Sequence, residues 1–413
     1  MIGLMDVNNF FVSCERLFRP DLTTKPVAVL SSNDGCIVAR SNEVKAMGVP
    51  MGIPLFQAKQ LVDMSQVTLF SSNFTLYRDI SRRVMEVLIE EVGECEQYSI
   101  DESFFVVPAA TTVTELATIR ATVMRKTGIP VSIGVAPTKT LAKVAAGIAK
   151  RTTGSTYLTL LEWQAIAGET TTGDIWNLGG ATERKLREQN VTTAREYMQL
   201  DRAWIATQFG VSGCRLYDEL HGDIAHAVQT NSADLRKSLT SSRSFASTTS
   251  VLSDLKSAVA YHVEQIAQKL RQQNLLATRM YVSMGASRHS DFAYRRGSIE
   301  IVLDRPSNET RYLLQRTTRA CEAHFEPGVP YKKAGVVAAG LIVPEFVQGD
   351  LFTAPDSTSD TTTLDTITDQ LNRRYGAGVI RSGAIQASGS RTSALLRSKS
   401  YTTAWNDIPS VIA

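Results

Sequence analysis

The sequence has 413 residues, of which 43% are hydrophobic and 21% are charged, as is typical of a globular protein. No apolar run approaches the roughly 20 residues that a membrane-spanning helix needs, and the N-terminus lacks the basic start of a signal peptide. The five cysteines form no C-x-x-C pair, which argues against a zinc site or a disulfide framework. We therefore expect a cytoplasmic protein without a membrane partner, and the length predicts about three structural units.

The net charge of +3 is unevenly distributed along the chain. Residues 232–344 contain 16 Lys and Arg against 9 Asp and Glu, whereas residues 1–231 contain 22 against 25. A localised basic segment favours a polyanionic partner, because cations that neutralise phosphates release condensed counterions. A solvated charged surface is the alternative interpretation of this feature taken alone.

Strand and helix patterns alternate through the first part of the chain. Four apolar segments predict strands: 2–7, 25–32, 97–107 and 129–136. Three segments with apolar residues at helical spacing predict helices: 73–92, 114–127 and 138–150. Gly93 and Gly128 are expected to end the first two helices. This alternation predicts an α/β layer with acidic residues at strand ends.

The pattern changes after this layer. Residues 158–228 predict a small module of four helices: 159–167, 181–189, 191–200 and 214–222. A stretch rich in Ser, Thr and Asn, residues 230–249, then predicts a linker.

A compact two-layer α+β domain is expected next. With residues 244–251 as its first strand, the order is β/α/β/β/α/β. The other expected elements are helices at 255–273 and 307–325 and strands at 278–287, 298–305 and 333–343. After Pro344 the composition turns polar, which predicts a mostly flexible tail with one helix at 364–374.

Three carboxylates lie at strand ends: Asp6 closes the first predicted strand, and Asp101 and Glu102 open another. Such carboxylates can bind Mg²⁺, and two ions between an attacking hydroxyl and a leaving pyrophosphate would form a phosphoryl-transfer site. Adjacent strand residues point to opposite faces, so Asp101 and Glu102 can share a site only at an irregular strand entry. A Glu102 that simply faces solvent is the alternative.

Three further patterns each allow two interpretations. Phe10 and Phe11 follow Asp6, where a ring can exclude a sugar 2′-hydroxyl or can be part of a core. Gly179 and Gly180 precede a predicted helix, as in the hairpin of helix-hairpin-helix DNA binders or in an ordinary loop. One group of cations would balance a triphosphate or form a plain basic surface: Arg40, Lys45, Lys139, Lys143 and Lys150.

Five longer segments resemble the UmuC type of Y-family DNA polymerases, the type of the catalytic subunit of bacterial DNA polymerase V. These segments are 6–15 (DVNNFFVSCE), 31–36 (SSNDGC), 70–77 (FSSNFTLY), 98–102 (YSIDE) and 134–143 (GVAPTKTLAK). The similarity runs from Met1 to about Pro344 and continues more faintly to the end. Several long motifs in one order are far more specific than a single glycine pattern.

The resemblance implies a right-hand polymerase built from α/β and α+β domains. It implies a catalytic palm (1–10 and 74–157), small fingers (11–73), a helix-hairpin-helix-like thumb (158–228), a linker (229–238), a DNA-binding little finger (239–344) and a C-terminal tail (345–413). The basic segment would then lie in the little finger, where it would hold duplex and template.

The resemblance also implies roles for single residues. Asp6, Asp101 and Glu102 match the catalytic acids that bind two Mg²⁺ ions, for which Mn²⁺ can substitute, and the carbonyl of Val7 would be a further metal ligand. Phe11 matches the steric gate that excludes ribonucleotides. The other residues that match contacts to the incoming nucleotide are Phe10, Arg40, Asn42, Lys45 and Lys150.

The activity implied is error-prone, template-directed DNA synthesis past lesions, in SOS mutagenesis and DNA repair. The substrates would be primer-template DNA and dNTPs. No segment resembles an exonuclease domain, so proofreading is not expected. Two other classes stay open on the residues alone: a non-catalytic DNA-binding scaffold, and a nucleotide cyclase with a similar palm and similar acids.

Residues 348–352 (QGDLF) resemble the sliding-clamp-binding peptide of bacterial polymerases. In such a peptide a glutamine and a terminal Leu-Phe enter a hydrophobic pocket. The residues concerned are Gln348, Asp350, Leu351 and Phe352. The further partners implied are a cleaved UmuD-type dimer and the RecA filament, in the bacterial cytoplasm and at the nucleoid.

Overall fold

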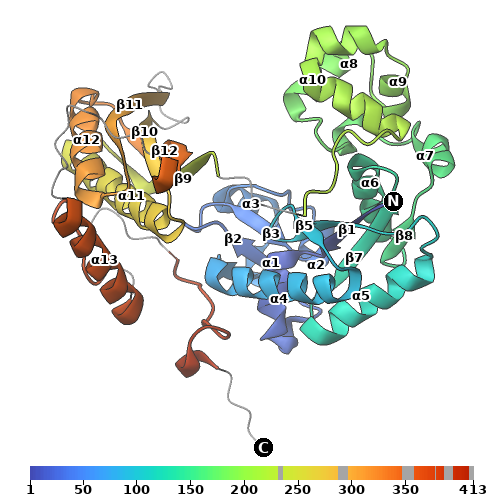
Figure 1. The fold of residues 1–413 in the computed structure, drawn as a ribbon. Coiled ribbons are helices and arrows are strands. Elements are labelled where there is room, and N and C mark those ends of the chain that lie inside the picture. Colours follow the sequence, from blue (N-terminus) through green and yellow to red (C-terminus); the bar gives the residue numbers. More distant parts are fainter. Residues whose placement is uncertain (231–235, 287–295, 347–357, 377, 386–393, 409–413) are drawn as a thin grey trace, which may run out of the picture. The chain divides into compact units, whose positions relative to one another are not determined.

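The structure is a computed structural model, and it describes residues 1–230, 236–286, 296–346, 358–376, 378–385 and 394–408. The chain divides into two compact units (Figure 1). Unit 1 comprises Met1–Ser232 and Ala394–Ala413, and unit 2 comprises Ala233–Ser393. No helix within the described ranges combines the length and the apolar character that crossing a membrane requires.

A five-stranded sheet forms the centre of unit 1, with the order β5-β6-β1-β7-β8. Strand β1 lies in the middle and pairs antiparallel with both β6 and β7. All six residues of β1 are buried, which explains its continuous apolar run in the sequence. The strands are β1 (Ile2–Val7), β5 (Cys95–Gln97), β6 (Glu102–Val106), β7 (Val131–Ala136) and β8 (Ser155–Tyr157).

Helices cover both faces of this sheet (Figure 1). Helices α4 (Phe74–Val92) and α5 (Val113–Thr127) pack on one face, and α6 (Lys139–Ala149) packs on the other. Strand residues alternate between the two cores: Met5 joins the core on the α4 and α5 side, while Leu4 joins the core on the α6 side. Asp6 lies two residues after Leu4 and therefore points to the same face of β1, the face that α6 covers.

Helix α6 lies unusually close to β7. A Cβ atom added at Gly134 of β7 would stand only 2.0 Å from the backbone nitrogen of Ala146, so no side chain fits there. The hydroxyl of Thr138 caps the N-terminus of α6. The buried carboxylate of Glu219, from α10 (Arg202–His221), accepts hydrogen bonds from the backbone and the hydroxyl of Thr140 at 2.8 and 2.7 Å. These contacts hold α6 at both its face and its end.

Two smaller modules complete unit 1. A three-stranded sheet, β3-β2-β4, carries two short helices and follows α1 (Phe10–Leu17). Its elements are β2 (Val27–Leu30), β3 (Ile37–Arg40), α2 (Asn42–Ala46), α3 (Leu55–Leu61) and β4 (Thr68–Ser71). The predicted helical module is confirmed as α7 (Leu160–Ile166), α8 (Gly180–Glu188), α9 (Ala194–Met198) and α10. Helix α10 begins twelve residues earlier than predicted, at Arg202, and is broken at Gly210, where φ is 62°.

Unit 2 has the predicted order β/α/β/β/α/β. Its four-stranded sheet, β11-β10-β12-β9, packs one face against two helices. The elements are β9 (Ser238–Thr249), α11 (Leu252–Gln272), β10 (Leu276–Ala286), β11 (Arg296–Ser307), α12 (Thr310–Ala323) and β12 (Tyr331–Ile342). The linker predicted over 230–249 is wrong from Ser238 onward, because these Ser- and Thr-rich residues pair with β12 as an edge strand.

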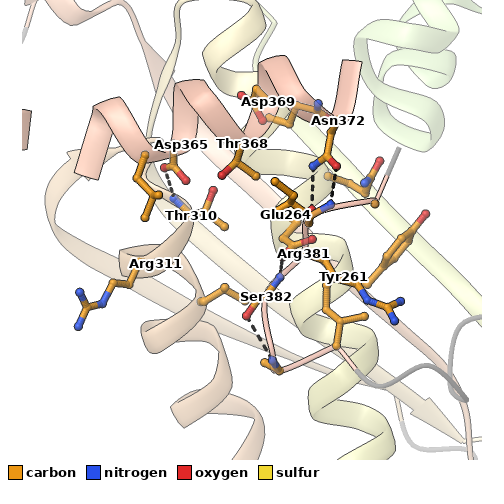
Figure 2. A pocket seen from close by; sticks show the side chains of 18 of the residues that line it. Tyr261, Glu264, Thr310, Arg311, Asp365, Thr368, Asp369, Asn372, Arg381 and Ser382 are labelled. Atoms are coloured by element: carbon orange, nitrogen blue, oxygen red, sulfur yellow. Dashed lines mark hydrogen bonds between the residues drawn. The ribbon is translucent and has the colours of Figure 1, made fainter. Parts of the chain in front are cut away.

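The helix predicted over 364–374 is confirmed within α13, whereas a mostly flexible tail is wrong for the other described residues after Pro344. Helix α13 (Thr358–Tyr375) lines a cavity of about 1060 Å³ together with α11 and α12 (Figure 2). Asp365 accepts from the backbone N–H of Thr310 at 2.9 Å, at the start of α12, and Arg271 pairs with both Asp365 and Asp369. Residues 394–408 pack on unit 1 instead. The clamp-like segment 348–352 lies outside the described residues.

The contact at Gly134 gives a first prediction. Gly134→Ala should lower the urea midpoint of unit 1 by an amount equivalent to about 1–3 kcal/mol, because overpacking displaces α6. Gly147→Ala is the matched control on α6 itself, since a Cβ there meets no atom within 4 Å. The control should be neutral or slightly stabilising, because alanine favours the helix. Equal midpoints for the two variants would contradict the close contact.

Candidate active site

The three predicted acids lie at one end of the central sheet. Asp6 and Glu102 are direct cross-strand partners on β1 and β6. The backbone N–H of Val7 donates to the carbonyl of Asp101 at 2.9 Å, which places Asp101 just outside the β6 ladder. The irregular strand entry that the sequence requires is therefore present: the predicted strand 97–107 is two strands joined by residues 98–101.

Ser99 organises this strand entry. Its hydroxyl donates to Oδ1 of Asp101 at 2.5 Å. The Oγ atom of Ser99 accepts from the backbone N–H groups of Asp101 and Glu102 at 3.2 and 3.1 Å. A serine hydroxyl that bonds its own following backbone is a common turn device, so Ser99 holds both acidic residues out of regular strand geometry. A signal for it is present in the sequence, because Ser99 directly precedes the Ile-Asp-Glu motif.

Lysines from α6 and its C-cap neutralise acids of the sheet. The Nζ atom of Lys150 lies 2.6 Å from Oδ1 of Asp6. Lys143 donates to both carboxylate oxygens of Glu102 at 3.0 Å. Lys139, which we grouped with these cations, instead pairs with Glu96 at 2.5 Å and is nearly buried. Two ammonium groups therefore supply positive charge beside Asp6 and Glu102.

Asp6 is electrostatically strained. Burial raises the pKa of its carboxyl from the ordinary 3.8 to about 6, and the charges of Glu102 and Asp101 add to this rise. The neighbouring Lys150 opposes the rise, through its charge and its hydrogen bond, without cancelling it. A carboxylate that is buried, ionised near pH 7 and surrounded by other carboxylates gains stability from any additional cation.

The donor set fits divalent metal ions. Carboxylate oxygens of Asp6, Asp101 and Glu102 are hard ligands of the kind that Mg²⁺ prefers. Throughout the described part of the chain, however, no three His, Cys, Asp or Glu side chains are grouped closely enough to hold an ion. In this arrangement Lys150 and Lys143 pair with the carboxylates of Asp6 and Glu102. Metal binding would therefore replace ammonium groups as the counter-charge.

A group of cations lies beside these acids. The pKa of Lys45, on α2, is lowered by burial and then by the positive charges of Arg40 and Lys150. These three residues come from β3, α2 and the end of α6, so the fold gathers cations that are distant in sequence. The Nζ atom of Lys45 donates to Asn9 at 2.6 Å and lies 3.4 Å from Oδ1 of Asn42. The predicted nucleotide-binding cations are thus brought together.

Asn9 was not predicted to take part, yet it connects these elements. It adopts a left-handed conformation with φ 47°, between the end of β1 and the start of α1. Asparagine tolerates this conformation better than most residues, and the Asn8-Asn9 pair is a turn signal. The side chain of Asn9 accepts from Lys45 and donates to Asn42 at 3.1 Å. It therefore links the acidic strand to the cations.

The two predicted aromatic residues have different surroundings. Phe10 is a core residue with 4% of its surface exposed. Phe11 is only partly buried and stacks on Tyr77 of α4, with ring centroids 4.5 Å apart and an angle of 15°. Phe74 packs edge-on against Phe11 at 5.7 Å. Phe10 is therefore a core aromatic residue, whereas Phe11 is partly exposed, and its stacking partner Tyr77 was not predicted.

The glycine pair lies where the sequence placed it. Gly179 is the N-cap of α8 and Gly180 is its first residue, and no side chain caps this helix end. The preceding Trp176 donates from its indole nitrogen to the hydroxyl of Tyr98 at 3.2 Å. This contact connects the helical module to the strand entry that carries Asp101.

Comparison with solved structures identifies the fold. The Y-family DNA polymerase chimera Dbh-Dpo4(243-245)-Dbh matches 83% of this chain and 100% of its own, with a TM-score of 0.68 and 20% sequence identity. The fold is therefore that of a Y-family DNA polymerase.

Sequence relatives identify the branch of the family. Models of the impB/mucB/samB family and of its C-terminal domain match residues 5–147 and 236–351, and a domain of unknown function (DUF4113) matches 362–411. Protein ImpB of Salmonella typhimurium is 32% identical over 424 residues, which cover 99% of each chain. Protein UmuC of Salmonella typhimurium strain LT2 is 32% identical over 92% of each chain. The chain belongs to the impB/mucB/samB family and is a DNA polymerase of the UmuC type.

The raised pKa of Asp6 gives a second prediction. Its folded-state pKa of about 6 exceeds the ordinary 3.8, so this carboxyl stabilises the fold only while protonated, and that stability is lost as pH rises from about 4 to 6. Without divalent ions, Asp6→Asn should therefore gain stability over wild type across this range, by about 3 kcal/mol at pH 7. Urea midpoints measured from pH 4 to 8 test this, with Glu94→Gln at an exposed position as control. A difference that shrinks as pH rises would contradict the assignment.

Proposed function

We propose that the chain performs error-prone translesion synthesis by metal-dependent nucleotidyl transfer. The primer 3′-hydroxyl attacks the α-phosphate of a dNTP paired to the template, a new phosphodiester bond forms, and pyrophosphate leaves. One observation carries this proposal: the carboxylates of Asp6 and Glu102 lie beside the cation group of Arg40, Lys45 and Lys150. Acids that can bind metal ions and cations that can bind a triphosphate are the two halves of such a site.

The acids would bind two divalent ions, Mg²⁺ or Mn²⁺. Bound there by Asp6, Asp101, Glu102 and the carbonyl of Val7, the ions would lower the pKa of the primer hydroxyl and neutralise the leaving phosphates. The side chains of Arg40, Asn42 and Lys45 would bind the triphosphate oxygens. Lys150 forms a salt bridge with Asp6, and its charge lowers the pKa of Lys45. Lys150 therefore interacts both with the acids and with the other cations. Its release from Asp6 would give the triphosphate a further cation.

Phe11 would exclude ribonucleotides. Its ring is held from behind by Tyr77 and from the side by Phe74, so it has little room to move away from a 2′-hydroxyl. Phe10 is a core residue whose ring lies 5.6 Å from that of Phe11, and it would support the Phe11 ring from the core side. An aromatic ring that its neighbours keep in place is what sugar discrimination by bulk requires.

Unit 2 would hold the DNA. The helices α11 and α12 cover one face of its sheet, and the opposite face carries Arg279, Tyr281 and Lys333, with both cations exposed. The segment 232–344 has 16 Lys and Arg against 9 Asp and Glu, so phosphate contacts would release counterions there. The lack of proofreading stays a prediction from the sequence. The clamp, a UmuD-type dimer and the RecA filament stay predicted partners, and the bacterial cytoplasm stays the predicted location.

Primer extension tests the acids. With Mg²⁺, a UmuD-type dimer and RecA filament supplied, wild type should extend a primer on an undamaged template and across an abasic site. Asp101→Ala should reduce both rates more than about 100-fold, because it removes charge stabilisation worth several kcal/mol. Glu94→Ala, at an exposed position on the same unit, should extend like wild type. If Asp101→Ala matches wild type, the metal site is assigned to the wrong residues.

Nucleotide selection tests the gate. Phe11→Ala should raise ribonucleotide incorporation relative to dNTP by tenfold or more, because the bulk that meets a 2′-hydroxyl is gone. Single-nucleotide kcat/KM values for dNTP and rNTP measure this ratio. Phe56→Ala removes a ring that is 64% exposed on α3 and is the matched control. An unchanged ratio in Phe11→Ala would refute the assignment of Phe11.

A further inference from the structure

The last described segment of the chain packs directly behind the aromatic residues of the active site. We call residues 394–408 the C-terminal clip; they belong to unit 1, although they follow unit 2 in the chain. Their contacts lie on α1, on β4 and on the N-terminus of α4. These are the elements that carry or support Phe11.

The clip joins the edge of a sheet. Strand β4 is an edge strand of the β3-β2-β4 sheet. The backbone N–H of Ser71 in β4 donates to the carbonyl of Leu396 at 3.0 Å, and the backbone N–H of Leu396 donates to the Ser71 hydroxyl at 3.0 Å. Ser71 and Arg397 form a parallel bridge. The clip therefore has a defined register against unit 1.

The clip then binds the N-cap of α4. Asn73 is fully buried, and its side-chain oxygen accepts from the backbone N–H of Leu76 to cap the helix. The side-chain nitrogen of Asn73 lies 3.0 Å from the Ser398 hydroxyl and 3.2 Å from the carbonyls of Ser398 and Lys399. Phe74 and Tyr77, which contact Phe11, lie in the first turn of α4.

A buried carboxylate connects the clip to Tyr77. Oε1 of Glu15 accepts from the hydroxyl of Tyr77 at 2.6 Å and from the hydroxyl of Ser398 at 3.0 Å. Glu15 has no exposed surface, and its Oε2 atom has no hydrogen-bond partner among the described residues. Loss of either hydroxyl would leave this buried group with a single partner, which is costly.

One face of α1 carries the whole arrangement. Phe11, Glu15 and Phe18 follow one another at intervals of four and three residues, so they share a face of the helix. Phe11 stacks on Tyr77, Glu15 binds Ser398, and Phe18 stacks on Tyr401 of the clip with centroids 4.5 Å apart. The clip thus contacts α1 at two points behind Phe11.

We propose that the C-terminal clip positions the sugar gate, with Ser398 and Glu15 as positioning residues that act on Phe11 through Tyr77. This inference rests on the proposed role of Phe11. The Ser398 hydroxyl keeps the Glu15 carboxylate in place, the carboxylate fixes the Tyr77 hydroxyl, and the Tyr77 ring forms the wall behind Phe11. Sugar discrimination, rather than catalysis itself, depends on the C-terminal clip.

The test uses full-length variants and the ratio of kcat/KM for dNTP to kcat/KM for the matching rNTP. Ser398→Ala should lower this ratio about two- to tenfold, the range expected for losing one hydrogen bond. The change should come from a lower KM for rNTP, while kcat for dNTP stays within twofold of wild type. Tyr77→Phe removes the other hydroxyl on the same carboxylate oxygen and should change the ratio in the same direction.

Two further variants separate this inference from a general effect on folding. Trp405→Ala removes a clip residue that is 89% exposed and should leave the ratio unchanged. In a Phe11→Ala background, Ser398→Ala should have no additional effect, because no gate is left to position. If Phe11→Ala lowers the ratio but Ser398→Ala leaves it unchanged, the positioning role of the clip is wrong and the gate assignment of Phe11 stands. An unchanged ratio in Phe11→Ala itself overturns the gate and the clip together.

Discussion

The contact between α6 and β7 at Gly134 is the constraint on which the candidate active site depends. A helix backbone can lie this close to a strand only where the strand lacks a Cβ atom. That closeness lets Lys143 reach Glu102 and lets Lys150 reach Asp6. The helical module reinforces it, because Glu219 binds the first turn of α6. An uncharged packing contact at Gly134 therefore determines which lysines reach the carboxylates of the site.

The site gathers carboxylates where burial disfavours them. Asp6 ionises only near pH 6, and each neighbouring acid makes its charge less favourable. In the protein alone, the salt bridges of Lys150 with Asp6 and of Lys143 with Glu102 reduce the free-energy cost of ionising these carboxyls. During catalysis, divalent ions would reduce the same cost. Because Lys150 also lies near Lys45, the same ammonium group can serve the acids or a triphosphate. Under the proposed function, this one cation with two partners would couple metal binding to nucleotide binding.

Local signals made much of the fold predictable from the sequence. The limits of α4 and α6 follow from the caps Asn73 and Thr138, and the position of Asp6 follows from the end of an apolar run. Composition misled where tertiary pairing decides: β9 is a polar edge strand held by β12 alone, and its Ser- and Thr-rich sequence is also typical of a linker. The first half of α10 was not predicted, because the helix is broken at Gly210.

The residues that support Phe11 could not be predicted from the sequence for a different reason. Tyr77 and Ser398 are 66 and 387 residues away from it, and only a buried carboxylate at Glu15 brings their hydroxyls together. A buried acid is unfavourable unless specific donors reach it, so its presence requires the surrounding elements to keep their positions. Helix α13 belongs to unit 2 and the clip belongs to unit 1. The C-terminal part of the chain is therefore built into both units, and the clip, residues 394–408, packs behind the aromatic residues Phe11 and Tyr77.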